Sequence, residues 1–115
     1  MHSPITTHVL DTSRGRPASG LNVALDFHAN DKTWQTIATG STNADGRISD
    51  LLPEKTKLAM GIYRLTFDTA SYFHGIEVEG FYPSVVVIFE IKDAAAHYHV
   101  PLLLSPYGYS TYRGS

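Results

Sequence analysis

The sequence predicts an all-β protein, a two-sheet antiparallel sandwich of about eight strands with one short helix. Two observations support this fold class. Apolar and polar residues alternate with a period of two in several segments of strand length, and turn-forming residues separate these segments at short intervals. One segment alone has the character of a helix. Because 115 residues is the usual size of one domain, we expect a single domain over residues 1–115.

The first strands follow from composition and alternation. Residues 5–11 are rich in β-branched side chains and precede a Ser-Arg-Gly-Arg-Pro loop. Residues 21–28 show the clearest alternation in the chain, typical of a half-buried antiparallel strand. Residues 33–40 alternate in the same way, and Asn30 and Asp31 predict the turn that joins the two strands into a hairpin.

The middle of the chain begins with a tight turn. Asp45 and Gly46 tolerate positive φ, so they predict a turn that leaves Arg47 just beyond it, followed by a brief strand over 48–52. The elements after it are, in order, a strand over 58–69, a short helix over 70–78 and a strand over 84–91. The helix is too short to be stable alone and should therefore lie on the sheets.

The C-terminal stretch is apolar and aromatic almost to its last residue, although chain ends are normally frayed and polar. In a strand over 97–104, one face should fill the core and the opposite face should carry His97 and His99. The residues predicted for the core face are Tyr98, Val100, Leu102 and Leu104. After a Ser-Pro-Tyr-Gly turn, a second strand from Tyr109 should run back and bring Arg113 and the carboxylate of Ser115 to a fixed place. The histidines, the arginine and the carboxylate at this end of the chain therefore suggest a functional site.

Composition excludes several classes of function. The formal net charge is -2 and the cationic side chains form no cluster, so we expect no nucleic acid partner. No apolar run is long enough to span a membrane. The absence of cysteine excludes disulfides and thiolate chemistry. The first residues lack the features of a secretory signal, so we expect a cytoplasmic protein, or a periplasmic one if a leader was removed.

The six histidines raise the question of a metal. His97 and His99 on one strand face resemble the arrangement in some β-sandwich metal sites, but no carboxylate lies at a ligand-like offset, so we expect no metal. Taken alone, His8 fits a packed or surface histidine and Arg47 a solvated charge. The residues by themselves therefore lead only to a β-sandwich with a candidate site at its C-terminal end.

The sequence also resembles the transthyretin-related proteins that act as 5-hydroxyisourate hydrolases, and the resemblance covers essentially the whole chain. The motifs that carry it are Thr7-His8-Val9-Leu10-Asp11, Gly15-Arg16-Pro17-Ala18, Thr42-Asn43-Ala44-Asp45-Gly46-Arg47, Phe81-Tyr82-Pro83, the segment from His97 to Pro106, and the closing Tyr112-Arg113-Gly114-Ser115. The closing tetrapeptide separates the hydrolases from the thyroid-hormone carriers. The resemblance implies a transthyretin-like sandwich.

The resemblance also implies the site residues. The family's catalytic positions fall on His8, Arg47, His99 and the tetrapeptide that ends in Ser115, while His97 is the less certain member of the histidine pair. Substrate binding would involve His8, Arg47 and the tetrapeptide, that is Tyr112, Arg113, Gly114 and Ser115. No cofactor is implied.

The implied reaction is the hydrolytic opening of 5-hydroxyisourate, a small-molecule substrate, at an amide bond in urate degradation. His99 or His8 would activate water, because a histidine with a pKa of about 6.5 supplies neutral imidazole at neutral pH. Arg47 and Arg113 would orient the substrate and offset charge at the attacked carbon. Ser115 would hold water or substrate through its hydroxyl or carboxylate. A chain extended past Ser115 should obstruct the channel between subunits and lose activity.

The family resemblance implies a homotetramer, a dimer of dimers whose active sites lie in a channel where the dimers meet. A partner chain would then cover the aromatic C-terminal strand. The main alternative is a transthyretin-like carrier that binds a small aromatic ligand in the same channel, although such pockets are mostly apolar. A β-sandwich adhesion or interaction domain is the third possibility, and it would leave the C-terminal motif without a purpose.

Overall fold

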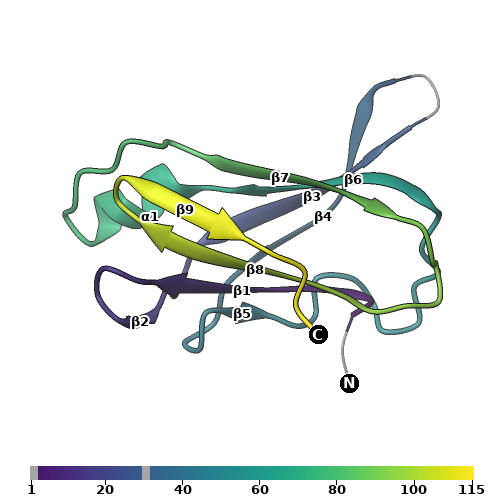
Figure 1. Ribbon diagram of the computed structural model, residues 1–115, viewed down its shortest axis with the longest axis horizontal. Coiled ribbons are helices and arrows are strands. Elements are labelled where there is room, and N and C mark those ends of the chain that lie inside the picture. The colour runs from purple at the N-terminus through teal and green to yellow at the C-terminus, as the bar shows by residue number, and fades with distance from the viewer. Residues whose placement is uncertain (1–2, 30–31) are drawn as a thin grey trace.

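The computed structural model describes residues 3–29 and 32–115, which form nine strands and one helix (Figure 1). The elements are β1 (Ile5–Asp11), β2 (Arg16–Pro17), β3 (Asn22–His28), β4 (Trp34–Ser41), β5 (Arg47–Ile48), β6 (Gly61–Phe67), α1 (Thr69–Gly75), β7 (Val85–Ile91), β8 (Tyr98–Ser105) and β9 (Gly108–Thr111). The turn predicted at Asn30 and Asp31 lies outside the described residues. In the described part of the chain, no helix is long and apolar enough to cross a membrane.

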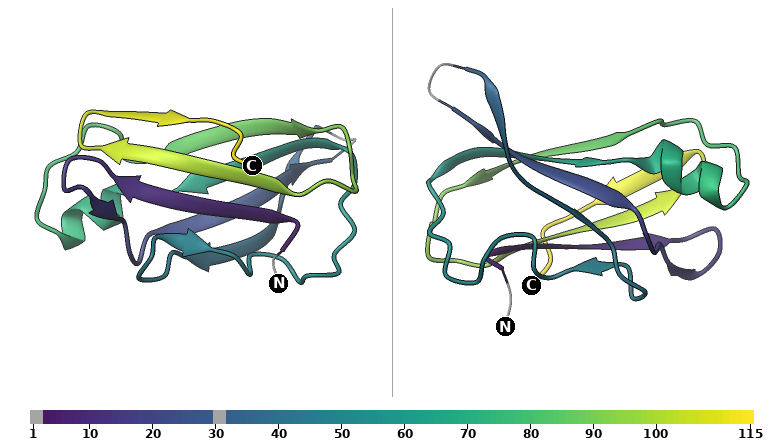
Figure 2. Two further views of the ribbon diagram at one scale, coloured as in Figure 1. Left: turned by 60° about the horizontal axis from the view of Figure 1, so that its bottom comes forward. Right: turned by 180° about the vertical axis from the view of Figure 1, so that it is seen from behind.

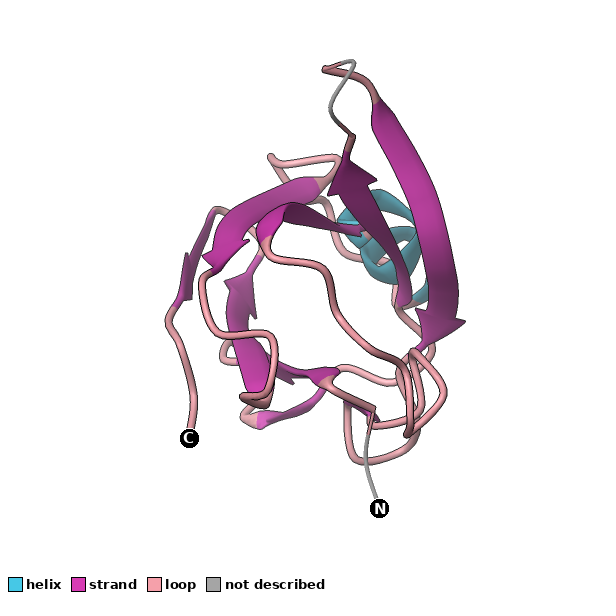
Figure 3. Cartoon of the chain, turned by 90° about the vertical axis from the view of Figure 1, so that its right-hand side faces the viewer, coloured by secondary structure: helices cyan, strands magenta, loops and turns pink. Residues whose placement is uncertain are grey.

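Two sheets pack face to face, so the predicted sandwich is confirmed (Figure 3). One sheet has the strand order β4-β3-β6-β7 and is antiparallel throughout. The other has the order β2-β1-β8-β9, and β5 pairs with β1 on the same edge as β2. Within this second sheet β1 and β8 run parallel, which places the first and the last long strand side by side (Figure 2). That single parallel pair departs from the antiparallel pattern expected from the sequence.

The core lies between the sheets and is built from alternate strand residues, because successive side chains of a strand point to opposite faces. On β8 the four residues predicted to face the core are all buried: Tyr98, Val100, Leu102 and Leu104. Leu25 and Leu65 of β3 and β6 pair with each other in register and are fully buried on the opposing sheet. The core therefore follows the predicted alternation, and the other face of β8 carries His99.

Some predicted boundaries were wrong. The strand expected over 48–52 pairs only at Arg47–Ile48, although Leu51 and Leu52 are buried. These two leucines fill the core from a loop, because apolar character marks burial and not strand pairing. The strand predicted over 58–69 spans only Gly61–Phe67.

The helix also differs from the prediction, since it spans Thr69–Gly75 instead of residues 70–78. It begins early because the side chain of Asp68 caps it by accepting a hydrogen bond from the backbone N–H of Ser71 at 3.1 Å. Its buried Tyr72 donates a hydrogen bond to the carboxylate of Asp11 at 2.7 Å, which fixes the helix against the end of β1. The helix therefore lies on the sheets, as expected for so short an element.

The turn before β5 depends on Gly46. Its φ is +74°, and a Cβ there would lie 2.4 Å from the carbonyl oxygen of Val9. The Gly46 carbonyl accepts a hydrogen bond from the Val9 N–H at 2.8 Å, so the turn is attached to β1. This attachment places Arg47 opposite His8 in the register of the two strands.

We expect Gly46→Ala to destabilise the protein by about 1–3 kcal/mol more than Gly15→Ala, the range for overpacking a filled site. Gly15 has a similar φ of +65°, but a Cβ there meets no atom within 4 Å, so its variant reports the backbone strain alone. Urea unfolding midpoints of the two variants give the comparison. Equal midpoints would show that the contact with Val9 does not constrain the turn.

Candidate active site

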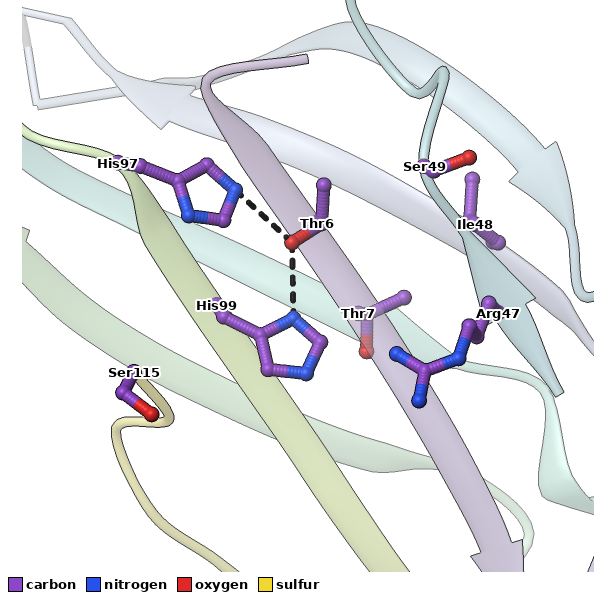
Figure 4. Close-up of a pocket in the computed structure, with 8 residues that line it drawn as sticks. All are labelled: Thr6, Thr7, Arg47, Ile48, Ser49, His97, His99 and Ser115. Carbon is purple, nitrogen blue, oxygen red and sulfur yellow. Dashed lines mark hydrogen bonds between the residues drawn. The ribbon is translucent and has the colours of Figure 1, made fainter. Parts of the chain in front are cut away.

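A cavity of about 310 Å³ opens on the face of the β1–β8 sheet that points away from the core (Figure 4). It is lined by Thr6, Thr7, Arg47, Ile48, Ser49, His97, His99 and Ser115. These residues come from four segments of the sequence, namely β1, β5 with the residue after it, β8 with the residue before it, and the C-terminus.

Strand register brings the predicted residues together. Thr6 of β1 lies opposite His99 of the parallel strand β8, and His8 of the same β1 face lies opposite Arg47 of β5. Because alternate residues of a strand share a face, His99, Thr6 and His8 project on the same side of the sheet. His8 borders the site through its pairing with Arg47, although it does not itself line the cavity.

The hydroxyl of Thr6 connects His97, the residue before β8, with His99 of β8. Its Oγ1 lies 3.1 Å from Nε2 of His97 and 2.8 Å from Nδ1 of His99, and Thr6 is buried. The two imidazole rings are 6.5 Å apart between centroids, with 15° between their planes. Sequence reasoning did not select Thr6. The available signal was that it shares a strand face with His8, two residues away.

The surroundings of the imidazoles favour their neutral forms. Burial lowers the pKa of His99, and the positive charge of Arg47 and the charges of His8 and His97 lower it further. Burial and then Arg47 also lower the pKa of His8, while Asp45 opposes this through a backbone hydrogen bond and its charge. The neutral form of both histidines, which can accept a proton, is therefore favoured at pH 7.

The last residues of the chain return to the site. The Gly114 N–H donates to the carbonyl oxygen of His99 at 2.8 Å in an isolated antiparallel bridge, and this contact places Ser115 in the cavity wall. Gly114 lies so close to the imidazole that a Cβ there would be 2.6 Å from Cδ2 of His99. The backbone of the tail therefore packs directly on the histidine ring.

The structure places two of the predicted residues elsewhere. The Arg113 guanidinium lies 4.4 Å above the ring of Tyr98 and donates a hydrogen bond to the carbonyl oxygen of His97 at 3.3 Å. Arg113 and Tyr112 line a second cavity of about 270 Å³, between β7 and β8, instead of the one around His99. The structure thus gathers His8, Arg47, His99, Gly114 and Ser115, and separates them from these two side chains.

We expect Gly114→Ala to lower turnover strongly while leaving the fold intact, because the new methyl group must displace either the His99 ring or the exposed tail. Gly108→Ala is the matched control in the same hairpin, since a Cβ there meets only Ser105 Oγ, at 3.7 Å. Steady-state kinetics and thermal unfolding of both variants provide the measurement. Full activity of Gly114→Ala would show that turnover does not require the close packing of the tail backbone on the His99 ring.

No group of three or more His, Cys, Asp or Glu side chains in the described ranges is arranged to hold a metal ion. The donors around the cavity are imidazoles, a guanidinium and hydroxyls. Together they can accept a proton, donate hydrogen bonds to carbonyl oxygens and stabilise negative charge.

The fold and the polar cavity define a β-sandwich with the site of a small-molecule hydrolase. The chain belongs to the HIUase/Transthyretin family, whose model matches residues 5–114. It is 47% identical over 114 residues to the 5-hydroxyisourate hydrolase of Mus musculus, covering 98% of this chain and 96% of that protein. It is 48% identical over 111 residues to that of Salmonella typhimurium, covering 96% and 80%. The predicted family resemblance is confirmed.

Solved structures share the fold. The 5-hydroxyisourate hydrolase of Klebsiella pneumoniae superposes with a TM-score of 0.84 at 38% identity, covering 96% of this chain and 98% of that one. Sea bream transthyretin in complex with thyroxine superposes with a TM-score of 0.90 at 33% identity, covering 96% and 94%. A 5-hydroxyisourate hydrolase and a transthyretin in complex with thyroxine thus both match the fold, so the side chains of the site must distinguish the two functions.

Proposed function

We propose that the chain hydrolyses 5-hydroxyisourate to 2-oxo-4-hydroxy-4-carboxy-5-ureidoimidazoline in urate degradation. The observation that supports this most is the cavity in which the neutral imidazole of His99 lies near the guanidinium of Arg47. One group can take a proton from water and the other can stabilise the oxyanion that forms on the attacked carbonyl. Several relatives of similar length carry this activity in their names.

The steps of the reaction follow from these groups. His99, or His8 beside it, accepts a proton from water as the water oxygen attacks the amide carbonyl of the substrate. Arg47 stays charged and donates hydrogen bonds to the developing oxyanion, and Ser115 offers a hydroxyl in the cavity wall. The imidazolium then returns its proton to the ring nitrogen that leaves. As placed in this chain, Arg113 contacts Tyr98, so its binding of substrate stays a prediction.

The carrier alternative is weaker because of the same side chains. The fold alone does not exclude it, since a transthyretin that binds thyroxine shares the architecture. Ligand pockets for aromatic molecules are lined mainly by apolar residues, whereas this cavity carries two histidines and an arginine. A cationic and imidazole-rich cavity suits a polar, carbonyl-rich purine derivative better.

Decay of the ultraviolet absorbance of freshly generated 5-hydroxyisourate, with and without the protein, tests the proposal. We expect the protein to accelerate the decay, and a chelator in the buffer to leave the rate unchanged. Loss of activity in chelator would point to a metal. Unaccelerated decay together with saturable binding of an aromatic ligand would support the carrier instead.

We further propose a homotetramer, a dimer of dimers. The edge strands β7 and β9 of the two sheets expose apolar side chains, with Ile88 at 58% and Tyr112, just past β9, at 57% of their full exposure. Exposed apolar edges favour pairing with another chain. Light scattering coupled to gel filtration measures the assembly, and a monomeric mass would contradict it. The single domain over 1–115 and the cytoplasmic location stay predictions.

A further inference from the structure

Thr6 forms a hydrogen-bonded bridge between two imidazoles, and the chemistry of a hydroxyl limits how this bridge can be arranged. A threonine hydroxyl has one proton to donate, while its oxygen can accept. The oxygen accepts up to two hydrogen bonds, but two N–H groups directed at it would leave the buried Thr6 proton without an acceptor, since the two ring nitrogens are the partners of this hydroxyl among the described residues. When both histidines are neutral, Thr6 therefore donates to one ring nitrogen and accepts an N–H from the other. The tautomers of His97 and His99 are coupled through Thr6, because fixing one of them fixes the other.

The position of Arg47 selects between the two arrangements. Figure 4 shows that the ring nitrogen of His99 that does not contact Thr6 lies on the side of the ring facing the Arg47 guanidinium. A guanidinium has donors only and a full positive charge, so it favours a lone pair at this nitrogen over an N–H dipole directed at it. With the lone pair at Nε2, the proton of neutral His99 must reside on Nδ1, the atom 2.8 Å from Thr6.

We propose that Thr6 accepts the Nδ1 proton of His99 and donates its own proton to Nε2 of His97, so that the Nε2 lone pair of His99 faces the cavity. Thr6 is then a positioning residue for the base, and His97 is the acceptor that keeps the Thr6 proton directed away from His99. This assigns a role to the first histidine of the pair. The importance of the lone pair for turnover rests on the proposed function, whereas the tautomer itself does not.

The arrangement fits the proton balance of the reaction. A proton from water adds to Nε2 of His99, and the resulting imidazolium keeps its Nδ1–H bonded to Thr6, so the bridge is unchanged during the step. The same Nε2 proton later passes to the leaving nitrogen of the substrate. In the opposite arrangement Nε2 would already carry a proton, and His99 could donate but not accept.

The first test is the tautomer of His99, read from long-range ¹H–¹⁵N NMR spectra of the folded, labelled protein above pH 7. We expect a protonated Nδ1 and an unprotonated Nε2 in the wild type. In Thr6→Val, which keeps the side-chain shape but removes the hydroxyl, the Nδ1–H loses its acceptor, so the preference for Nδ1–H should weaken to what the Arg47 charge alone maintains. A wild-type His99 protonated at Nε2 would overturn the proposal, whether or not the protein hydrolyses 5-hydroxyisourate.

The second test uses turnover and includes a rescue. We expect Thr6→Val to lower kcat by roughly threefold to tenfold, the equivalent of one lost hydrogen bond, and Thr6→Ser to restore most of it. His97→Phe removes the acceptor, so the Thr6 proton turns toward His99 and kcat should fall by a similar factor. The double variant should lose little more than either single one. If the kcat losses of Thr6→Val and His97→Phe multiply in the double variant and the His99 tautomer is unchanged, Thr6 acts only through packing and the proposal is wrong.

Discussion

His99→Ala is expected to lower kcat for 5-hydroxyisourate at least about tenfold, and toward the 10²–10⁴-fold typical of a lost general base. His97 and His99 both line the cavity and contact the Thr6 hydroxyl, but His97 does so through Nε2, whereas His99 uses Nδ1 and keeps Nε2 on the side facing Arg47. No neighbouring imidazole therefore supplies a lone pair in the same position. Rates of substrate decay at saturating substrate give kcat directly, and gel filtration shows whether the assembly is retained.

His74→Ala is the matched control for this loss. His74 is exposed on α1, outside the cavity, and its removal should leave kcat unchanged. Wild-type turnover in a folded His99→Ala protein would remove His99 from the mechanism and leave His8 as the base. A large loss in both variants would instead indicate a general effect on folding.

Arg47→Gln has the second large expected effect, a fall in kcat/KM of about 10²–10³, as when one oxyanion donor is removed. It should also change the pH profile. Arg47 lowers the pKa of both His99 and His8, so its removal raises these pKa values toward 6.5. More of the base is then protonated at a given acidic pH, and the acidic limb of the kcat/KM profile moves to higher pH.

The other groups around the two histidines, His97, Asp45 and Ser115, are unchanged in this variant, so the shift reports Arg47 alone. Arg16→Gln removes the same charge from β2, outside the cavity, and should move neither the limb nor the rate. An acidic limb that stayed at its wild-type pH would show that the Arg47 charge does not act on the base.

Local patterns in the sequence predicted the long strands better than the short strands and the buried loops. The alternation in β8 gave its core face correctly, because burial of every second residue leaves a direct record in the sequence. The two-residue strand β2 was taken for loop, since so short a pairing has no period to detect. Leu51 and Leu52 were mistaken for part of a strand because they are apolar and buried, although their backbone pairs with no strand.

The site depended on information that local patterns do not contain. His8 and Arg47 were named through family resemblance, since the residues alone left His8 as a packed or surface histidine and Arg47 as a solvated charge. Strand alternation had placed His99 on the non-core face of the C-terminal strand, but its catalytic role also came from the resemblance. Thr6 was missed because its importance comes from the parallel register that sets it opposite His99, 93 residues away. The direction of the Arg113 side chain could not be predicted from the sequence either, because it depends on how the tail packs against Tyr98.

The parallel pairing of β1 with β8 also determines when the site can appear during folding. Every contact between Thr6 and His99 closes a loop of nearly the whole chain, which has a high entropic cost and forms late in proteins dominated by distant contacts. Neither end of the chain can complete the site by itself, because β1 and β5 supply His8 and Arg47 while β8 and the tail supply His99 and Ser115. A folding intermediate that has formed only the β4-β3-β6-β7 sheet would have its core face uncovered and would be unable to bind the substrate.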